Sequence, residues 1–177
     1  RPAPPVSAAP FTVRVTLAAP YVGFGASEML LKVGAILSIS STVVLVVANS
    51  LNARSVKEFI ATAKARTTPL LSSSAGAGSS MHMNAERFRL VAGIPARHVG
   101  FKGAAEAVLE VPAGRVHYTV AALTIALPMI KDGKVTPLAV IAPQRSATLP
   151  DVPLMTDTFP GYGRDGSYCL LAPAGTP

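Results

Sequence analysis

The sequence predicts an α/β protein in which a mostly parallel β-sheet is flanked by helices. Two observations support this prediction. Residues 43–47 form a continuous run of Val and Leu, the composition of a strand that is buried on both faces. From there to residue 142, strand-like and helix-like segments alternate with short connections, as in a parallel sheet covered by helices. Half of the 177 residues are hydrophobic, which is enough for the core of one such domain.

The first helix is predicted from its capping residues and from the spacing of its apolar residues. Ser55 and Glu58 have the spacing of a capping box, with Ser at the N-cap and Glu at the third helical position. Apolar residues then recur on one helical face as far as about Arg66, and they are Val56, Phe59, Ile60 and Ala63. Further helices are predicted at residues 81–92, about 103–110 and 125–131.

Strands are predicted at residues 69–73, 97–101, 116–121, 135–142 and 167–172, and the alternation of Phe11 to Leu17 is also strand-like. For the helix at 125–131, Thr124 is the expected N-cap, and Pro128 falls in the first turn, where a missing N–H is tolerated. Gly133 is expected to end this helix.

The composition excludes two broad classes of protein. Charged residues are only 14% of the chain and the mean hydropathy is +0.43, so a disordered chain is excluded. The most apolar stretch, Met29 to Ala48, is interrupted by Lys32 and by the polar residues 38–42. No uninterrupted run within it therefore reaches the ~18–20 apolar residues of a spanning helix. We interpret the high hydropathy as buried strands.

The formal net charge of +7 favours anionic partners. Nucleic acid is not the predicted partner, because the basic residues are scattered and aromatic residues are 6% of the chain, with no Trp. A solvated basic surface is the favoured explanation of the charge, and a small-anion site would also suit it.

The most informative segment is the small-residue loop from Ser72 to Ser80, between a predicted strand and a predicted helix. Its glycines allow a ligand to approach the backbone, and the helix N-terminus offers free N–H groups and a positive dipole end. Ligands of open α/β sheets bind at the carboxyl ends of strands, where this loop lies. We therefore predict an anion cradle. The alternative is a flexible loop in which Ser80 only caps the helix.

Phe101-Lys102-Gly103 is a second candidate, because it follows another strand and opens another helix. It should lie at the same sheet edge as the Ser72–Ser80 loop, where Lys102 could supply a positive charge to an anion. The alternative is an exposed lysine beside a glycine that starts a helix.

No catalytic residue, metal site or cofactor is predicted. The small-residue loop lacks the third glycine of the dinucleotide fingerprint and any Gly-Lys-Ser sequence, and there is no nucleophile elbow. His82, His98 and His117 do not have metal-ligand spacing. The single cysteine, Cys169, is expected in the core and excludes an intrachain disulfide. An α/β enzyme that binds an anionic substrate at the loop remains the alternative to a binding protein.

Several motifs, in order along the chain, resemble the receptors of tripartite tricarboxylate transporters, also called Bug proteins. The resemblance covers about residues 34–177, and its last motif is nearly verbatim. The motifs are the helix from Ser55 to Ala65, the Ser-Gly-x-Gly-Ser-x-x-His pattern from Ser74 to His82 with Ala75 inserted, His98 to Gly103, Leu149 to Pro153, Pro160 to Tyr162, and Leu170 to Pro177.

This resemblance implies a periplasmic binding protein of the two-lobed Venus-flytrap type (type II) that delivers a small organic carboxylate to a membrane permease. It implies contacts to the carboxylate from backbone N–H groups and hydroxyls. The ligand-binding residues that carry over are Ser74, Gly76, Ala77, Gly78, Ser79, Ser80, Phe101 and Lys102.

The same resemblance suggests a division of the chain. Residues 1–35 are a divergent N-terminal segment, residues 36–142 form the α/β ligand-binding lobe, and residues 143–177 are a hinge-crossing segment that returns to the other, incomplete lobe. The chain begins at Arg1 without a cleavable signal pattern, so we expect a mature or trimmed piece that stops mid-fold.

There are departures from the family's pattern. The family's Pro-Pro-Gly-Gly carboxylate loop has no counterpart in residues 1–33. His117 and Ala121 stand where the family often carries acids, which makes an amino-acid ligand less favoured.

Overall fold

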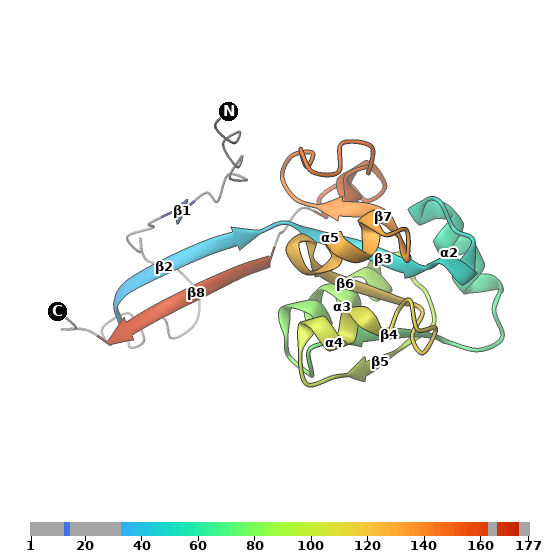
Figure 1. Ribbon diagram of the computed structural model, residues 1–177, viewed down its shortest axis with the longest axis horizontal. Coiled ribbons are helices and arrows are strands. Elements are labelled where there is room, and N and C mark those ends of the chain that lie inside the picture. The colour runs from blue at the N-terminus through green and yellow to red at the C-terminus, as the bar shows by residue number, and fades with distance from the viewer. Residues whose placement is uncertain (1–12, 15–32, 163–165, 174–177) are drawn as a thin grey trace, which may run out of the picture. The chain divides into compact units, whose positions relative to one another are not determined.

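The computed structural model describes residues 13–14, 33–162 and 166–173 (Figure 1). The chain divides into two compact units, one of residues 42–166 and one of residues 1–41 together with 167–177. The division at residues 35 and 142 that we expect from the sequence stays a prediction.

The smaller unit contains a three-stranded sheet in the order β1-β2-β8. Its strands are β1 (Val13–Arg14), β2 (Val33–Ser41) and β8 (Gly166–Pro173), and β1 pairs antiparallel with β2. The strand predicted at residues 11–17 is seen at Val13–Arg14, and its remainder lies outside the described residues. Cys169 lies in β8, and the burial predicted for its side chain also lies outside what is described.

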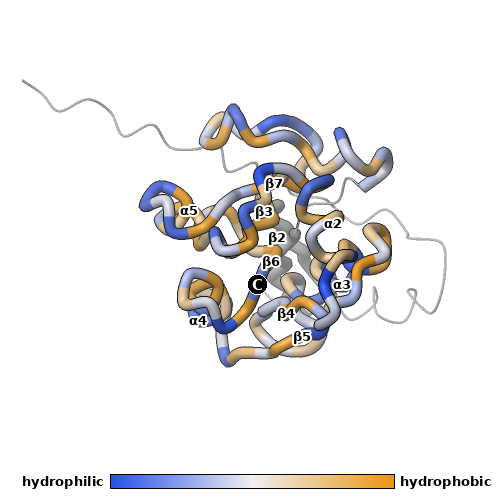
Figure 2. The backbone as a smooth tube through the Cα atoms, turned by 90° about the vertical axis from the view of Figure 1, so that its right-hand side faces the viewer, coloured by the Kyte–Doolittle hydropathy of each residue, from blue (hydrophilic) through white to orange (hydrophobic). Residues whose placement is uncertain are grey.

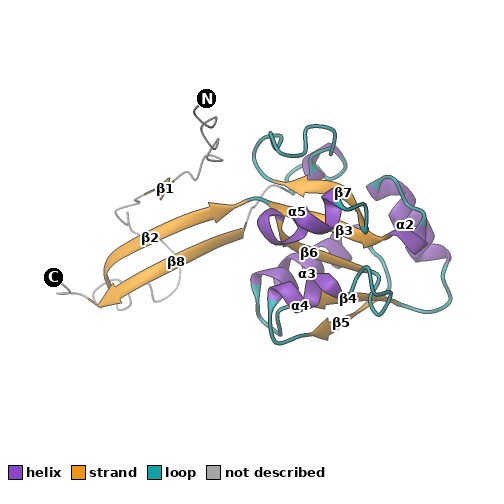
Figure 3. Ribbon diagram, viewed as in Figure 1, coloured by secondary structure: helices purple, strands orange, loops and turns teal. Residues whose placement is uncertain are grey.

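The larger unit is an α/β domain, as predicted, with a five-stranded sheet in the order β5-β4-β6-β3-β7 (Figure 3). The strands are β3 (Val43–Ala48), β4 (Leu70–Ser74), β5 (Ala96–Gly100), β6 (Tyr118–Ala122) and β7 (Val135–Ile141). The helices are α2 (Val56–Ala65), α3 (Ser80–Ala92), α4 (Ala104–Leu109) and α5 (Leu123–Lys131), and the 3-10 turns are η1 (Asn49–Leu51) and η2 (Met155–Asp157).

Strand β3 lies inside the sheet, and all six of its residues are buried, as the sequence predicts. The sheet is mostly parallel, as predicted, and β3 is the strand that runs against the other four. β3 pairs antiparallel with both neighbours, β6 and β7, whereas β4 is parallel to β5 and to β6. Burial on both faces makes a strand apolar along its whole length whichever way it runs, so the composition of residues 43–47 carries no information on direction.

The sheet is the middle of three layers (Figure 2). Alternate side chains of β3 point to opposite faces, so Val43, Leu45 and Val47 pack in the cluster that contains Phe59 of α2 and Phe88 of α3. The intervening side chains pack in the cluster formed with α4 and α5. The core predicted for the first helix is therefore confirmed, with Val56 and Phe59 buried and Ile60 partly buried against the same cluster.

The helix caps correct three details of the prediction. Helix α3 begins at Ser80 and its N-cap is Ser79. Helix α5 begins at Leu123 with Ala122 as its N-cap, so Thr124 lies inside the helix. Pro128 is therefore beyond the first turn. The missing N–H of Pro128 leaves the carbonyl of Thr124 without its intrahelical partner.

Two other caps follow the sequence more closely. Gly133 follows the end of α5 with a φ of +66°, as expected. Ser55 caps α2 by accepting from the Glu58 N–H, while the Glu58 carboxylate accepts from the N–H of Arg54 rather than of Ser55.

No helix within the described ranges is both long enough and apolar enough to cross a bilayer.

Candidate functional site

The small-residue loop follows β4 at one end of the sheet, the edge formed by the carboxyl ends of β4 and β5. The Phe101 N–H donates to the Ser74 carbonyl over 2.8 Å, directly after these two strands. The loop also passes close to the end of β5, because a Cβ atom on Gly100 would lie 3.4 Å from the Cα of Gly76. The two segments that the sequence singled out therefore meet at one edge, as expected for parallel strands.

Hydrogen bonds within the loop hold it in one conformation. The Ser74 Oγ accepts from the Gly76 N–H over 3.2 Å, and the Ser79 N–H and Oγ both donate to the Gly76 carbonyl, over 3.3 and 2.7 Å. Ser79 also caps α3 by accepting from the His82 N–H over 3.2 Å. Gly76 and Gly78 have φ values of +104° and +79°, which residues with a Cβ adopt only with strain.

A smaller set of donors in the loop remains available to a ligand. Among the described residues, the N–H groups of Ala77, Ser80 and Met81 and the Ser80 hydroxyl have no hydrogen-bond acceptor. Ala77 and Ser80 are exposed, whereas Met81 is buried. Two of these N–H groups belong to the first turn of α3, whose positive dipole end favours an anion. The site is therefore narrower than the full loop.

The second predicted segment offers less to a ligand than its position suggests. The Phe101 N–H bonds the Ser74 carbonyl, and the Lys102 N–H donates to the Glu106 carboxylate over 3.2 Å. The Lys102 side chain is exposed and makes no ion pair among the described residues. A long-range attraction of anions is the contribution that this residue can make.

Sequence spacing gave no reason to group His82 with His98, yet the fold brings them together at the loop. Their ring centroids are 3.9 Å apart and their planes differ by 34°. The His82 Nδ1 accepts from the Gly78 N–H over 3.0 Å, and the His98 Nε2 lies 2.6 Å from the Ser74 Oγ. Burial lowers the pKa of His98, the nearby His82 lowers it further, and Glu86 opposes them.

The Ser74–His98 pair has the spacing of a nucleophile and its base, but the Ser74 side chain cannot reach a substrate. Ser74 is 0% exposed, and its Oγ also lies 3.0 Å from the Gly76 carbonyl. An accessible nucleophile is a requirement of this kind of catalysis. Within the described ranges, no three His, Cys, Asp or Glu side chains are grouped so that they could hold a metal ion.

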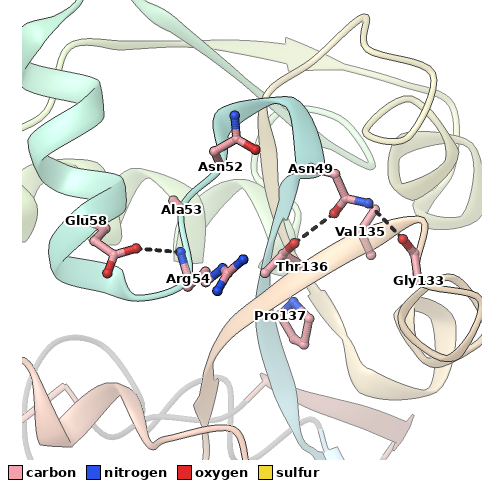
Figure 4. A pocket seen from close by; sticks show the side chains of 9 residues that line it. All are labelled: Asn49, Asn52, Ala53, Arg54, Glu58, Gly133, Val135, Thr136 and Pro137. Atoms are coloured by element: carbon pink, nitrogen blue, oxygen red, sulfur yellow. Dashed lines mark hydrogen bonds between the residues drawn. The ribbon is translucent and has the colours of Figure 1, made fainter.

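A cavity of about 780 Å³ lies at the opposite edge of the sheet, where β3 ends and β7 begins (Figure 4). Its polar groups mostly bond one another. The Asn49 side chain donates to the Gly133 carbonyl and accepts from the Thr136 hydroxyl, while Glu58 accepts from the Arg54 N–H. The Arg54 guanidinium makes no ion pair among the described residues, although Glu58 places a carboxylate in the same lining.

Comparison with known proteins places this fold among the periplasmic binding proteins. The computed structural model resembles the solved structure of Rhodopseudomonas palustris Rpa4515 with adipate, with a TM-score of 0.72 and 31% identity over 83% of this chain and 48% of that one. It resembles MatC (Rpa3494) from the same organism with bound malate, with a TM-score of 0.73 and 26% identity over 83% of this chain and 50% of that one.

The sequence defines the family more closely. Residues 8–177 match the tripartite tricarboxylate transporter family receptor, and the chain belongs to this family. BugT of Bordetella pertussis is 28% identical over 96% of this chain. A Cupriavidus necator protein encoded in the gbd 5' region is 30% identical over 70% of it. The chain spans 52% of BugT and 37% of the Cupriavidus protein.

Proposed function

We propose that this chain captures a small organic carboxylate as part of a periplasmic solute-binding protein, which passes the ligand to a membrane permease. The observation that carries the proposal is the set of free donors at the start of α3, formed by the N–H groups of Ala77, Ser80 and Met81 and the Ser80 hydroxyl. A carboxylate accepts several such bonds at once and favours the positive end of a helix.

The family supports the class of ligand. Two solved proteins with the same fold hold the carboxylates adipate and malate. The net charge of +7 attracts anions in general, and exposed Lys102 adds to this attraction at the sheet edge. The burial of the Ser74 Oγ favours binding over catalysis, because Ser74 is the serine that lies within hydrogen-bond distance of a histidine ring and its side chain cannot reach a substrate.

The eight residues proposed from the sequence divide into four roles. Ala77 and Ser80 offer free donors to the ligand. Ser74, Gly76, Gly78 and Ser79 shape the loop through bonds to one another and to His82. Phe101 joins β5 to β4, and Lys102 supplies charge.

We expect weak binding by these 177 residues alone. Each exposed, charge-assisted hydrogen bond nets only ~1.5–3 kcal/mol, and the loss of translational and rotational freedom opposes association. Two or three such bonds leave a millimolar dissociation constant.

The test is a titration of the chain with malate, adipate, citrate and acetate, followed by NMR because the expected affinity is millimolar. The polyol glycerol and the cation ethylammonium are the matched ligands without a carboxylate. Saturable shifts with the carboxylates alone are the expected result. Equal shifts with glycerol, or no response to any carboxylate, would contradict the proposed function.

A further inference from the structure

Two histidines that offer nothing directly to the proposed ligand lie against the loop, one on α3 and one on β5. Each is bonded to a different end of the loop, and their ring centroids are 3.9 Å apart with the ring planes tilted by 34°. They are the only pair of described titratable side chains in direct hydrogen-bond contact with residues 74–79.

His82 fixes the C-terminal half of the loop through two bonds. Its own N–H donates to the Ser79 Oγ over 3.2 Å, and its Nδ1 accepts from the Gly78 N–H over 3.0 Å. Gly78 has a φ of +79° and is exposed, so this bond holds a residue that is otherwise free to move. An acceptor Nδ1 carries no proton, which fixes neutral His82 in the tautomer with its proton on Nε2.

His98 acts on the N-terminal end of the loop. Its Nε2 lies 2.6 Å from the Ser74 Oγ, which in turn accepts from the Gly76 N–H. This contact suits either charge state of His98, because a serine hydroxyl can both donate and accept. The contact between His82 and Gly78 differs, since a backbone N–H can only donate.

We propose that His82 and His98 are positioning residues for the loop and that carboxylate binding requires the neutral form of His82. Protonation of His82 would place an N–H donor against the Gly78 N–H. The bond would be lost, and the segment from Ala77 to Ser80 would be released from its present shape. The part of this inference that concerns affinity rests on the proposed function.

The charged and titratable groups around the pair act on His98 in both directions. Burial and the neighbouring His82 lower the pKa of His98. Glu86, one turn along α3, acts in the opposite direction, and its carboxylate is paired with Arg89 at 2.8 Å. Tyr118, from β6, carries no charge in this range, because burial raises its pKa to about 12.

The first test measures malate affinity from about pH 7.5 to about pH 5.5 for the unaltered chain, His82→Asn and His82→Ala. The carbonyl oxygen of Asn can take the place of Nδ1 and does not titrate, and protonation of the ligand affects all three proteins alike. The unaltered chain should lose roughly 5-fold more affinity than His82→Asn on acidification, the effect of about one hydrogen bond. His82→Ala should bind roughly 5-fold more weakly even at the higher pH.

The same series can overturn the inference. Identical pH profiles for the unaltered chain and His82→Asn would do so. A relative gain in affinity on acidification would also do so, because it would mean that the charge of His82 attracts the ligand and that its bond to Gly78 is dispensable.

A second measurement needs no ligand and separates this inference from the proposed function. The amide NMR signal of Gly78 should shift with pH in the unaltered chain and stay constant in His82→Asn. If no carboxylate binds at all, the proposed function fails and this titration still decides the role of His82. A Gly78 amide chemical shift that does not change with pH in either protein would overturn the inference. His98→Gln, which can keep a polar contact to Ser74, should bind better than His98→Ala.

Discussion

The two ends of the five-stranded sheet use the same type of hydrogen bond in different settings. We call the end at which β4 and β5 terminate the loop edge, and the end at which β3 terminates and β7 begins the opposite edge. At one edge, the His82 Nδ1 accepts from the N–H of Gly78, a loop residue with a positive φ. At the other edge, the His117 Nδ1 accepts over 2.9 Å from the N–H of Leu71, near the start of β4. The His117 N–H donates back to the Leu71 carbonyl over 2.8 Å, so this pair joins two strands and holds no exposed loop.

The edges also differ in how their polar groups are satisfied. The cavity beside Asn49 and Thr136 has a volume of about 780 Å³, and its polar groups mostly bond one another. The loop edge has free N–H groups at Ala77 and Ser80. If the carboxylate binds at the loop as proposed, the difference between the two edges teaches that uncommitted backbone donors are a better guide to an anion site than a hollow surface, because each committed donor must first break a bond. The cavity does hold one uncommitted cation, the Arg54 guanidinium, which makes no ion pair among the described residues.

The largest expected effect concerns the hydrophobic core, on which both edges of the sheet depend. Phe59 is 0% exposed and packs against Phe88 and Tyr118, with ring centroids 5.9 and 5.4 Å away. Phe59→Ala should lower the free energy of unfolding by about 3–5 kcal/mol, the usual cost of removing a buried Phe side chain. Denaturant unfolding measures this change. The control is Leu109→Ala, at a site 51% exposed, which should cost less than about 1 kcal/mol.

A matched pair of glycine substitutions should separate the edges. Gly78 and Gly133 have φ values of +79° and +66°, and a Cβ at either position would meet no atom within 4 Å. Valine at each should therefore strain the backbone to a similar extent, at about 1–3 kcal/mol. Gly78→Val should weaken malate binding beyond detection, because loop shape determines where the donors point, while Gly133→Val should leave it unchanged. Equal losses of affinity in both would mean that the loop has no special role.

Two adjacent serines should give a smaller and more specific contrast. Ser79→Ala removes the N-cap of α3 and should lower the free energy of unfolding by about 1 kcal/mol. Ser80→Ala should change stability by less than about 0.5 kcal/mol and weaken malate binding about 5-fold, because the Ser80 hydroxyl is uncommitted. Thermal melts and NMR titrations measure the two effects. Loss of stability in Ser80→Ala, with binding unaffected, would contradict this division of roles.

The smallest expected effect concerns pH and the edge opposite the loop. Burial lowers the pKa of His117 below its usual 6.5, and the charge of Arg66 adds to this effect. The unfolded chain therefore binds a proton more readily than the folded chain. The stability contributed by neutral His117 is complete above about pH 6.5 and is lost as the pH falls through the lower, folded pKa.

His117→Asn should remove this part of the decline without altering malate affinity, as judged from melting temperatures between about pH 7.5 and 5. If the melting temperature fell more steeply with falling pH in the variant than in the unaltered chain, neutral His117 would not be the form that stabilises the fold.

Local patterns in the sequence predicted most of the fold. Three features depend only on neighbours in the chain, so each could be predicted from the sequence. They are the apolar run at residues 43–47, the serine cap of α2 and the glycine after α5. The direction of β3 was not readable, because its partners β6 and β7 lie some 70 to 100 residues away. The start of α5 was missed for a related reason. Its first N–H donates to the carbonyl of Thr42, which a local capping rule cannot anticipate.

The candidate site shows the same limit. The small-residue loop was readable from its composition, and its position at a strand end followed from the α/β pattern. Which donors stay free depends on partners elsewhere in the chain, such as His98 beside Ser74 and Glu106 at the Lys102 N–H. Sixteen residues separate His82 from His98, and no local period links them.

The most direct test of the central claim is an NMR titration of the unaltered chain with malate, in which the backbone amide of each residue is followed. Our account predicts that the amides of Ala77, Ser80 and Met81 shift first and saturate together. Those of Asn52 and Arg54, beside the opposite cavity, should stay in place. Saturable shifts at Asn52 and Arg54, with the loop amides unchanged, would contradict the account and place the carboxylate at the other edge of the sheet.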